Sequence, residues 1–213
     1  NVELPEGGYV EGTSDPTTMY ASSKAAVALI ADSYARTRGL EYTALRYFNI
    51  AGPIQDYKRT VPPLFAGVAI RLLGGNNPII FGDGTRRRDF IHVDDVNAFH
   101  LQCLVDNRTV NETFNLGMNN SNSLYDISQI IFEYLKDEIP ADYLEYDNLP
   151  EINGEAHTIY SNIDKAKAIG WAPQKTIEDA IYDTIDYLKL EIEKGNVDPT
   201  TFMSGINSDD LKI

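Results

Sequence analysis

The sequence predicts an α/β protein in which helices flank a parallel β-sheet. Segments with the β-branched and aromatic composition of strands alternate along the chain with longer segments that have the pattern of helices. This alternation is typical of parallel sheets, because the return path between two parallel strands needs a helix or a long connection. Neither internal repeats nor low-complexity tracts interrupt the pattern.

Six helices are expected after a loop over residues 1–17. They cover residues 18–38, 61–73, 94–106, 123–136, 164–169 and 176–194. Gly39 ends the first helix, and Pro62 and Pro63 are expected in the first turn of the second, where a missing N–H does no harm. Asp94 or Asp95 caps the third helix.

The fourth helix and the strands have equally local signals. Ser123 opens that helix with Asp126 three residues later, an acidic variant of the capping box. The expected strands cover residues 42–48, 78–81, 90–93, 113–116 and 143–146. Glycine and proline break the chain at 51–53 and turn it at 82–84, and residues 195–213 are expected to form a loose polar tail.

The charge balance narrows the classes of partner. The 213 residues include 32 acidic and 18 basic side chains, which give a net charge of −14. Such a chain repels nucleic acid and anionic membranes, so neither is expected as a partner. An anionic substrate remains compatible, because a few local arginines can bind a phosphate. The longest apolar run, 25–31, is far shorter than the roughly 20 residues of a membrane span.

Cysteine and histidine usage favours a cytoplasmic protein without a metal site. Cys103 is the only cysteine, which excludes a disulfide within the chain. Residues 1–12 lack the basic head and apolar stretch of a signal peptide, so a reducing cytoplasm is expected. His92, His100 and His157 are scattered without metal-ligand spacing.

Two groups of residues suggest chemistry. Tyr20 and Lys24 lie on one face of the first predicted helix, where an ammonium beside a phenol favours a phenolate that can exchange a proton with a sugar hydroxyl. The spacing alone is weak, because Tyr34 and Arg38 repeat it on an ordinary helix surface. Arg88 ends a run of three arginines that is rare positive density in an acidic chain, and a guanidinium fits phosphate oxygens.

The alternatives to a functional reading are structural. The arginine run also fits a solvated basic loop, and Arg86 and Arg87 are expected at the surface. Two further residues, to which a binding role is assigned below, also have structural explanations. Asn49 could turn the chain after the first strand, and Phe81 could be a buried residue of the hydrophobic core.

Four ordered segments carry a family resemblance. They read YASSKAAVALIADSYARTRGLEYTALRYFNIAGP, PIIFGDGTRRRDFIHVDDV, ETFNLGMNNSNSLYDISQII and GEAHTIYSNIDKAKAIGWAP. In order and spacing they resemble extended short-chain dehydrogenase/reductases that act on nucleotide sugars. The resemblance implies the C-terminal part of a Rossmann-type parallel sheet with flanking helices, plus a smaller α/β substrate-binding lobe. It assigns 1–53 and 91–117 to the NAD-binding domain, 54–90 and 118–194 to the lobe, and 195–213 to a tail.

The same resemblance implies roles for individual residues. Tyr20 would be the catalytic acid/base, Lys24 its partner that binds the ribose of NAD, and Tyr47 a neighbour of the nicotinamide. Asn49 and Arg88 would bind the diphosphate of a nucleotide sugar. Three apolar side chains would border the base: Val61, Phe65 and Phe81.

The implied activity is NAD-dependent epimerisation of a nucleotide sugar at C4 through a transient 4-keto intermediate, with UDP-glucose and UDP-galactose, or their N-acetylated forms, as the favoured pair. Two alternatives stay open: a nucleotide-sugar 4,6-dehydratase and a non-catalytic nucleotide-sugar-binding fragment. The resemblance also implies that the intact enzyme forms a homodimer through helix 18–38, and this helix offers small residues that allow close approach.

The sequence departs from the family pattern in three places. Met19 stands where a proline usually precedes the tyrosine, and Ile152 stands where a further phosphate-binding arginine is common. The Gly-rich turn G-x-x-G-x-x-G of the family does not occur in this sequence, and the family's catalytic Ser or Thr, about 25 residues before the tyrosine, would fall before Asn1. The 213-residue chain is therefore expected to be inactive alone.

Overall fold

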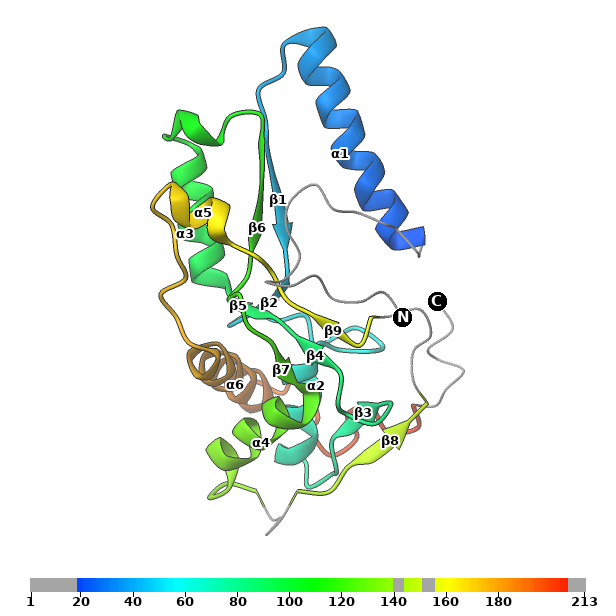
Figure 1. Cartoon of the computed structure of the whole chain (residues 1–213). Coiled ribbons are helices and arrows are strands. Elements are labelled where there is room, and N and C mark those ends of the chain that lie inside the picture. Colours follow the sequence, from blue (N-terminus) through cyan, green and yellow to red (C-terminus); the bar gives the residue numbers. More distant parts are fainter. Residues whose placement is uncertain (1–18, 140–143, 151–155, 207–213) are drawn as a thin grey trace.

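The computed structural model describes residues 19–139, 144–150 and 156–206, and it is an α/β structure with parallel strands and flanking helices (Figure 1). The helices are α1 (Met19–Arg38), α2 (Leu64–Leu73), α3 (Val93–Cys103), α4 (Leu124–Leu135), α5 (Asp164–Ala168) and α6 (Ile177–Glu193). A short 3₁₀ turn covers Asn107–Thr109. The fold class expected from the alternation of patterns is thus confirmed.

The strands pair mostly in parallel. Their bounds are β1 (Thr43–Tyr47), β2 (Asn49–Ala51), β3 (Ile79–Phe81), β4 (Arg87–Arg88), β5 (Phe90–His92), β6 (Glu112–Leu116), β7 (Asn122–Ser123), β8 (Asp147–Leu149) and β9 (Thr158–Ile159). β1 pairs with β6, β2 with β5, and β3 with β8, each in parallel. β4 lies between β7, which is antiparallel to it, and β9, which is parallel.

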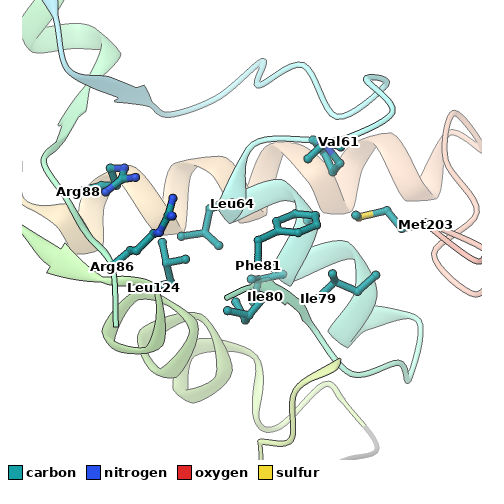
Figure 2. Close-up of a pocket in the computed structure, with 12 residues that line it drawn as sticks. Val61, Leu64, Ile79, Ile80, Phe81, Arg86, Arg88, Leu124 and Met203 are labelled. Atoms are coloured by element: carbon teal, nitrogen blue, oxygen red, sulfur yellow. The ribbon is translucent and has the colours of Figure 1, made fainter. Parts of the chain in front are cut away.

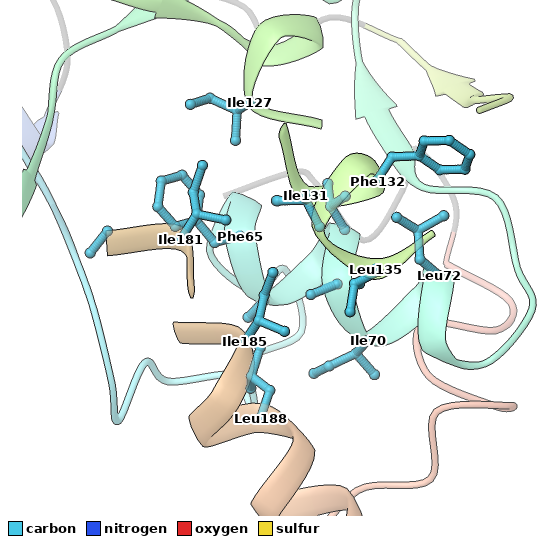
Figure 3. Packing of buried hydrophobic residues seen from close by; sticks show 14 of the residues in the cluster. Phe65, Ile70, Leu72, Ile127, Ile131, Phe132, Leu135, Ile181, Ile185 and Leu188 are labelled. Carbon is cyan, nitrogen blue, oxygen red and sulfur yellow. The ribbon is translucent and has the colours of Figure 1, made fainter. Parts of the chain in front are cut away.

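The buried apolar side chains form two clusters. The larger one lies where α2, α4 and α6 pack together, and Figure 3 shows Phe65 of α2 and Ile131 of α4 close to Ile181 and Ile185 of α6. The smaller one joins α3, β5, β6 and α5, with Phe99 in edge-to-face contact with Phe114 at a centroid distance of 5.1 Å.

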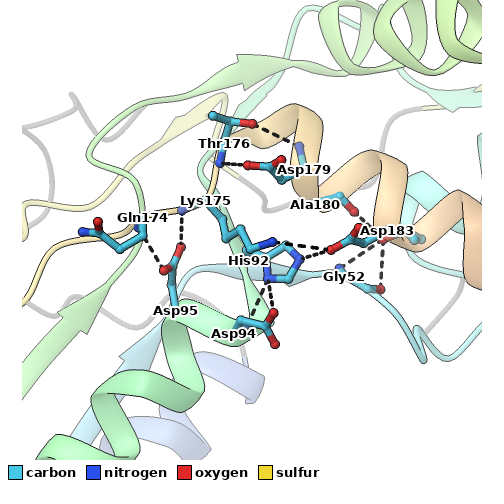
Figure 4. A network of polar contacts seen from close by, with 11 residues as sticks. Gly52, His92, Asp94, Asp95, Gln174, Lys175, Thr176, Asp179, Ala180 and Asp183 are labelled. Carbon is cyan, nitrogen blue, oxygen red and sulfur yellow. Dashed lines mark hydrogen bonds and ion pairs between the residues drawn. The ribbon is translucent and has the colours of Figure 1, made fainter.

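A polar network joins the start of α3 to the start of α6 (Figure 4). The ring nitrogen Nδ1 of buried His92 accepts a hydrogen bond from the amide of Asp94 at 3.0 Å, so Nε2 carries the proton and donates to Asp183 Oδ2 at 3.1 Å. The carboxylate of Asp95 accepts hydrogen bonds from the amides of Gln174 and Lys175 at 2.9 and 3.0 Å. The network therefore fixes the relative position of the two clusters.

Several local expectations are confirmed and others are wrong. Ser123 caps α4 in a capping box with Asp126, as the sequence predicts. Pro63 is the N-cap of α2 and does not lie in its first turn. His92 caps α3 in place of Asp94 or Asp95, because its ring already supplies the acceptor that the first free amide needs.

The strand and tail predictions also need correction. A strand is expected over 143–146, and the structure has a strand at 147–149. Residue 143, the first of the expected strand, falls outside the described part of the chain. β4, β7 and β9 are only two residues long, too short for a periodic pattern to reveal them. Residues 195–206 are not loose, since Val197 and Phe202 pack against the larger cluster. The rest of the expected tail, 207–213, lies outside the described residues.

The predicted division into two parts remains a prediction, and packing differs from it in one region. Residues 163–171 fall in the expected lobe, yet Ile163, Ala166 and Trp171 pack in the smaller cluster with α3 and β6. The reason is that α5 lies beside β6, with Lys165 donating to the carbonyl of Thr113 at 2.7 Å.

Helix α1 stands apart from both clusters. It has 20 residues and none of them is buried, and Figure 1 shows it leaning away from the strands that follow it. Its exposed large apolar side chains are Met19, Tyr20, Val27, Leu29, Ile30 and Tyr34. Among the described residues, no helix is both long enough and apolar enough to cross a membrane.

Candidate functional site

A pocket opens between α2, β3, β4 and the start of α4, and the C-terminal segment closes one side (Figure 2). Most of its wall is apolar. The lining residues are Val61, Pro62, Leu64, Gly67, Val68, Ile79, Ile80, Phe81, Arg86, Arg88, Leu124 and Met203. In Figure 2 the two arginines lie at one end of the pocket, and Phe81, Ile79 and Met203 lie toward the other. An apolar pocket with two guanidinium groups at one end fits a ligand with a flat apolar part and an anionic part.

The direction of the extended chain determines which of the three arginines in the run point into the pocket. Successive residues of an extended chain point to opposite sides, so Arg88 of β4 and Arg86, which directly precedes β4, both line the pocket, and Arg87 points the other way. Arg87 turns to the start of α4, where it donates to the hydroxyl and carbonyl oxygens of Ser121 and forms an ion pair with Asp126 at 3.4 Å. The expectation that Arg86 lies at the surface is wrong, because only 7% of it is exposed.

The predicted substrate-binding residues are partly brought together. Val61, Phe81 and Arg88 line the same pocket. Phe65 does not: its side chain is fully buried, with its ring 4.8 Å from that of Phe90, so the expectation that it borders a ligand is wrong for this structure. Asn49 lies on β2, and its side-chain amide donates to the carbonyl oxygen of Asp89, beside Arg88, at 2.8 Å.

Asp89 is a residue of this region that the sequence analysis missed. It is fully buried and accepts hydrogen bonds from the amide of Met118 at 2.7 Å, the amide of Ser161 at 2.9 Å and the hydroxyl of Ser161 at 2.6 Å. Burial raises the pKa of Asp89, and the hydrogen bonds from Ser161 and Met118 oppose that rise. Its partners are 29 and 72 residues away along the chain, so no local pattern could reveal it.

The turn after β6 depends on glycine at this point. A Cβ atom on Gly117 would lie 2.4 Å from the hydroxyl oxygen of Ser161 and 2.6 Å from Oδ2 of Asp89. Asp89 thus links β5 to the ends of β6 and β9, directly behind Arg88. We infer from this geometry that Asp89 holds the backbone of Arg88 in position.

The predicted catalytic pair lies on the exposed helix α1. The Nζ atom of Lys24 is 5.3 Å from the centre of the Tyr20 ring, as expected for residues four apart on a helix. Tyr20 is 72% exposed, and neither residue lines the pocket described above. The helix therefore presents a phenol and an ammonium side by side on an open face.

Tyr47 lies at the C-terminal end of β1, half exposed. Nδ1 of His100 lies 2.9 Å from the carbonyl oxygen of Val96 and so carries the ring proton. Nε2 of His100 is then an acceptor, and the hydroxyl of Tyr47 donates to it at 2.8 Å. Burial raises the pKa of Tyr47, which keeps the phenol protonated for this hydrogen bond.

The chemistry of these donors fits one end of a dinucleotide. Phenol hydroxyls and an ammonium can hydrogen-bond the hydroxyl groups of a ribose, so the chemistry of Tyr20, Lys24 and Tyr47 is compatible with the nicotinamide-ribose end of NAD, and the role of each stays a prediction. In the described parts of the chain, no group of three His, Cys, Asp or Glu side chains could hold a metal ion.

Comparison with known proteins places these features in one family. Residues 4–117 match the model of the "NAD dependent epimerase/dehydratase family". The chain is 30% identical over 184 residues to UDP-glucose 4-epimerase of Corynebacterium glutamicum, covering 78% of this chain and 54% of that one. It is 29% identical over 179 residues to dTDP-glucose 4,6-dehydratase of Mycolicibacterium smegmatis, covering 82% and 51%.

Solved structures agree with the sequence matches. The crystal structure of UDP-glucose 4-epimerase with UDP-glucose from Thermotoga maritima has a TM-score of 0.74 and 27% identity, covering 89% of this chain and 62% of that one. The chain spans about half the length of the curated relatives it matches. Since the family model matches more than half of its residues, the chain belongs to the NAD-dependent epimerase/dehydratase family.

Proposed function

We propose that the protein containing this chain epimerises a nucleotide sugar at C4 in an NAD-dependent reaction, with UDP-glucose and UDP-galactose as the substrate pair. The observation that carries the proposal is the pocket with Arg86 and Arg88 at one end and an apolar wall around Phe81 at the other. A nucleoside diphosphate has the matching parts, a flat base and a doubly charged diphosphate. Membership of the family supports the reaction type.

The binding end of the mechanism follows from the walls of the pocket. Arg88 pairs with the diphosphate through the planar fork of its guanidinium, and Arg86 adds a second positive charge beside it. The sequence has Ile152 at a position where the family commonly has a further phosphate-binding arginine, and Arg86 supplies a positive charge in its place. Position 152 lies outside the described residues. Val61 and Phe81 border the base, and Asn49 borders the diphosphate from β2.

The reacting end uses the open face of α1. Tyr20 removes the proton from the C4 hydroxyl of the sugar and later returns it, while Lys24, beside it on α1, holds the ribose of the cofactor. NAD, when bound, supplies the hydride acceptor at C4. The 4-keto sugar would need room to turn over in the site, so that C4 regains a hydride on its other face while Tyr20 returns the proton to the oxygen.

The second candidate is a 4,6-dehydratase of a nucleotide sugar. It is supported by the 29% identity to the dehydratase of Mycolicibacterium smegmatis. Both reactions begin with oxidation at C4, so the pocket and Tyr20 serve either of them. The reaction product therefore distinguishes an epimerase from a 4,6-dehydratase.

The deciding experiment incubates the full-length protein with NAD and either UDP-galactose or dTDP-glucose. Formation of UDP-glucose supports the epimerase, and formation of a 4-keto-6-deoxy sugar supports the dehydratase. Binding of UDP without turnover of either sugar would support the third possibility, a nucleotide-sugar-binding protein without catalysis.

Replacing Arg88 with alanine is expected to raise KM for the nucleotide sugar with little change in kcat. The variant loses a charged hydrogen bond that is present before and during the reaction, which costs about 1.5–3 kcal/mol, or about 10- to 150-fold in KM. Steady-state kinetics on the full-length protein measures it. Arg87→Gln is the matched control, because Arg87 points to Ser121 and Asp126, outside the pocket. Equal effects of the two substitutions would contradict the assignment.

We also propose that the intact protein forms a homodimer through α1. The support is that α1 buries no residue within this chain and combines exposed apolar side chains with alanines. Light scattering of the full-length protein at micromolar concentration is expected to give the mass of a dimer, and Leu29→Lys is expected to shift it toward the monomer. A monomer mass for the unmodified protein would refute the proposal.

A further inference from the structure

The segment after α6 forms an ordered strap over the pocket region. We define the C-terminal strap as residues 196–206. It begins at α6, where the side-chain amide of Asn196 donates to Oε2 of Glu191 at 2.8 Å. Hydrogen bonds from Asn196, Tyr57 and Lys194 lower the pKa of Glu191 to about 2, so this anchor is an ionised carboxylate at neutral pH.

The strap is held against the C-terminal end of α2. Arg71 is almost fully buried and donates from Nη1 to the carbonyl oxygen of Phe202 at 3.2 Å, while its Nη2 forms an ion pair with Asp147 at 3.0 Å. The side-chain amide of Asn76 donates to the carbonyl oxygen of Thr200 at 3.3 Å. The backbone of the strap is thus fastened to α2 and the turn that follows it, and Arg71 is itself held by β8 through Asp147.

The close approach of strap and helix requires a glycine. A Cβ atom on Gly74 would lie 2.0 Å from the carbonyl oxygen of Pro199, a distance that no side chain could tolerate. Asp198 shapes the turn that follows, since its Oδ1 accepts hydrogen bonds from the amide and hydroxyl of Thr200 at 2.9 and 2.7 Å. The path of the strap is therefore built into both partners.

Met203 of the strap lies in the wall of the pocket. Its backbone has a φ of 56°, in the left-handed region that residues other than glycine rarely adopt. Its sulfur lies over α2 at Gly67, 3.9 Å from where a Cβ of that glycine would be. Figure 2 shows the side chain at the end of the pocket away from Arg86 and Arg88.

We propose that the C-terminal strap is part of the nucleotide-sugar site and that Met203 is a specificity-determining residue that contacts the nucleobase. The inference rests on the proposed function, because the two arginines must hold the diphosphate for the base to fall at the other end. There the base meets Phe81 from β3 and Met203 from the strap. An unbranched thioether is polarisable and adapts to the face of an aromatic ring.

The proposal predicts which bases the pocket accepts. A wall fastened to α2 through Arg71 and Gly74 cannot easily retreat, so it limits the size of the base. A pyrimidine is expected to fit, and a purine is expected to be rejected. Shortening the side chain of Met203 should weaken binding of a pyrimidine nucleotide. It should also reduce the difference in affinity between pyrimidine and purine nucleotides.

The experiment measures binding of UDP, ADP and inorganic pyrophosphate to the full-length protein by calorimetry. Met203→Gly suits the left-handed backbone and removes the wall, and it is expected to weaken UDP binding by about 5- to 10-fold without lowering Tm. ADP binding is expected to stay equal or improve, and pyrophosphate binding to stay unchanged. Met203→Leu should retain most of the affinity for UDP, and Ser204→Ala, an exposed neighbour, is the matched control.

The outcomes separate this inference from the proposed function. Unchanged UDP binding in Met203→Gly, while the unmodified protein binds UDP, would overturn the role of the strap and leave the proposed function standing. An equal loss of UDP and pyrophosphate binding would also overturn it, because the effect would then not involve the base. No UDP binding by the unmodified protein would overturn both.

Discussion

In the intact protein, Tyr20→Phe is expected to lower kcat by at least about 10²–10⁴-fold while KM for the nucleotide sugar stays close to normal. The substitution removes only the phenol oxygen, which is needed when the proton of the C4 hydroxyl moves. Because Tyr20 is not part of the pocket wall, binding of the nucleotide should not depend on it. Steady-state conversion of UDP-galactose to UDP-glucose with added NAD gives both constants.

Helix α1 supplies its own control for this experiment. Tyr34 and Arg38 have the same spacing as Tyr20 and Lys24 on the same helix, and both tyrosines are exposed. Tyr34→Phe is therefore expected to leave kcat and KM unchanged. Full activity of Tyr20→Phe would refute the catalytic assignment, and a comparable loss in Tyr34→Phe would show that any change to α1 disturbs the enzyme.

Asp89→Ala is expected to destabilise the protein by about 3–5 kcal/mol, the largest loss of stability among the substitutions considered. The variant leaves the amides of Met118 and Ser161 and the hydroxyl of Ser161 buried without their acceptor. It also leaves a void between β5 and the ends of β6 and β9. Denaturant unfolding of the full-length protein, followed by circular dichroism, measures the change.

Two further variants test the cause of that loss. Asp89→Asn keeps the volume and one acceptor oxygen but directs an amide toward donors, so an intermediate loss of about 2–3 kcal/mol is expected. Asp94→Ala removes an exposed carboxylate five residues away and should change the free energy of unfolding by less than about 0.5 kcal/mol. A loss below 1 kcal/mol in Asp89→Ala would mean that water replaces the carboxylate and that Asp89 does not hold Arg88 in place.

The longer elements could be predicted because their signals are local. The capping box of Ser123 and Asp126, the strand ending at Leu116 and the long helix α6 all appear near their expected positions. Strands of two residues could not be predicted, because two residues cannot display a period. His92 was missed as a cap because capping by an imidazole depends on its rotation, which the contact with Asp183 fixes.

The candidate site divides in the same way. The family resemblance pointed to Val61, Phe81 and Arg88, and these three residues line one pocket, while their roles stay predictions. Arg86 was misplaced, because a run of three arginines does not say which faces of a strand its members occupy. Met203 was missed for a different reason: it lies 115 residues after Arg88, in a segment without any pattern.

The sequence by itself determined the family and the α/β class, because ordered motifs and helix signals depend only on neighbours along the chain. The tertiary structure alone decided that Asp89 is a buried support, that Arg86 faces the pocket and that Met203 completes its wall. Each of these depends on contacts between segments far apart in sequence. Such contacts arise from packing, which fixes strand faces and buries polar groups only where distant partners can satisfy them.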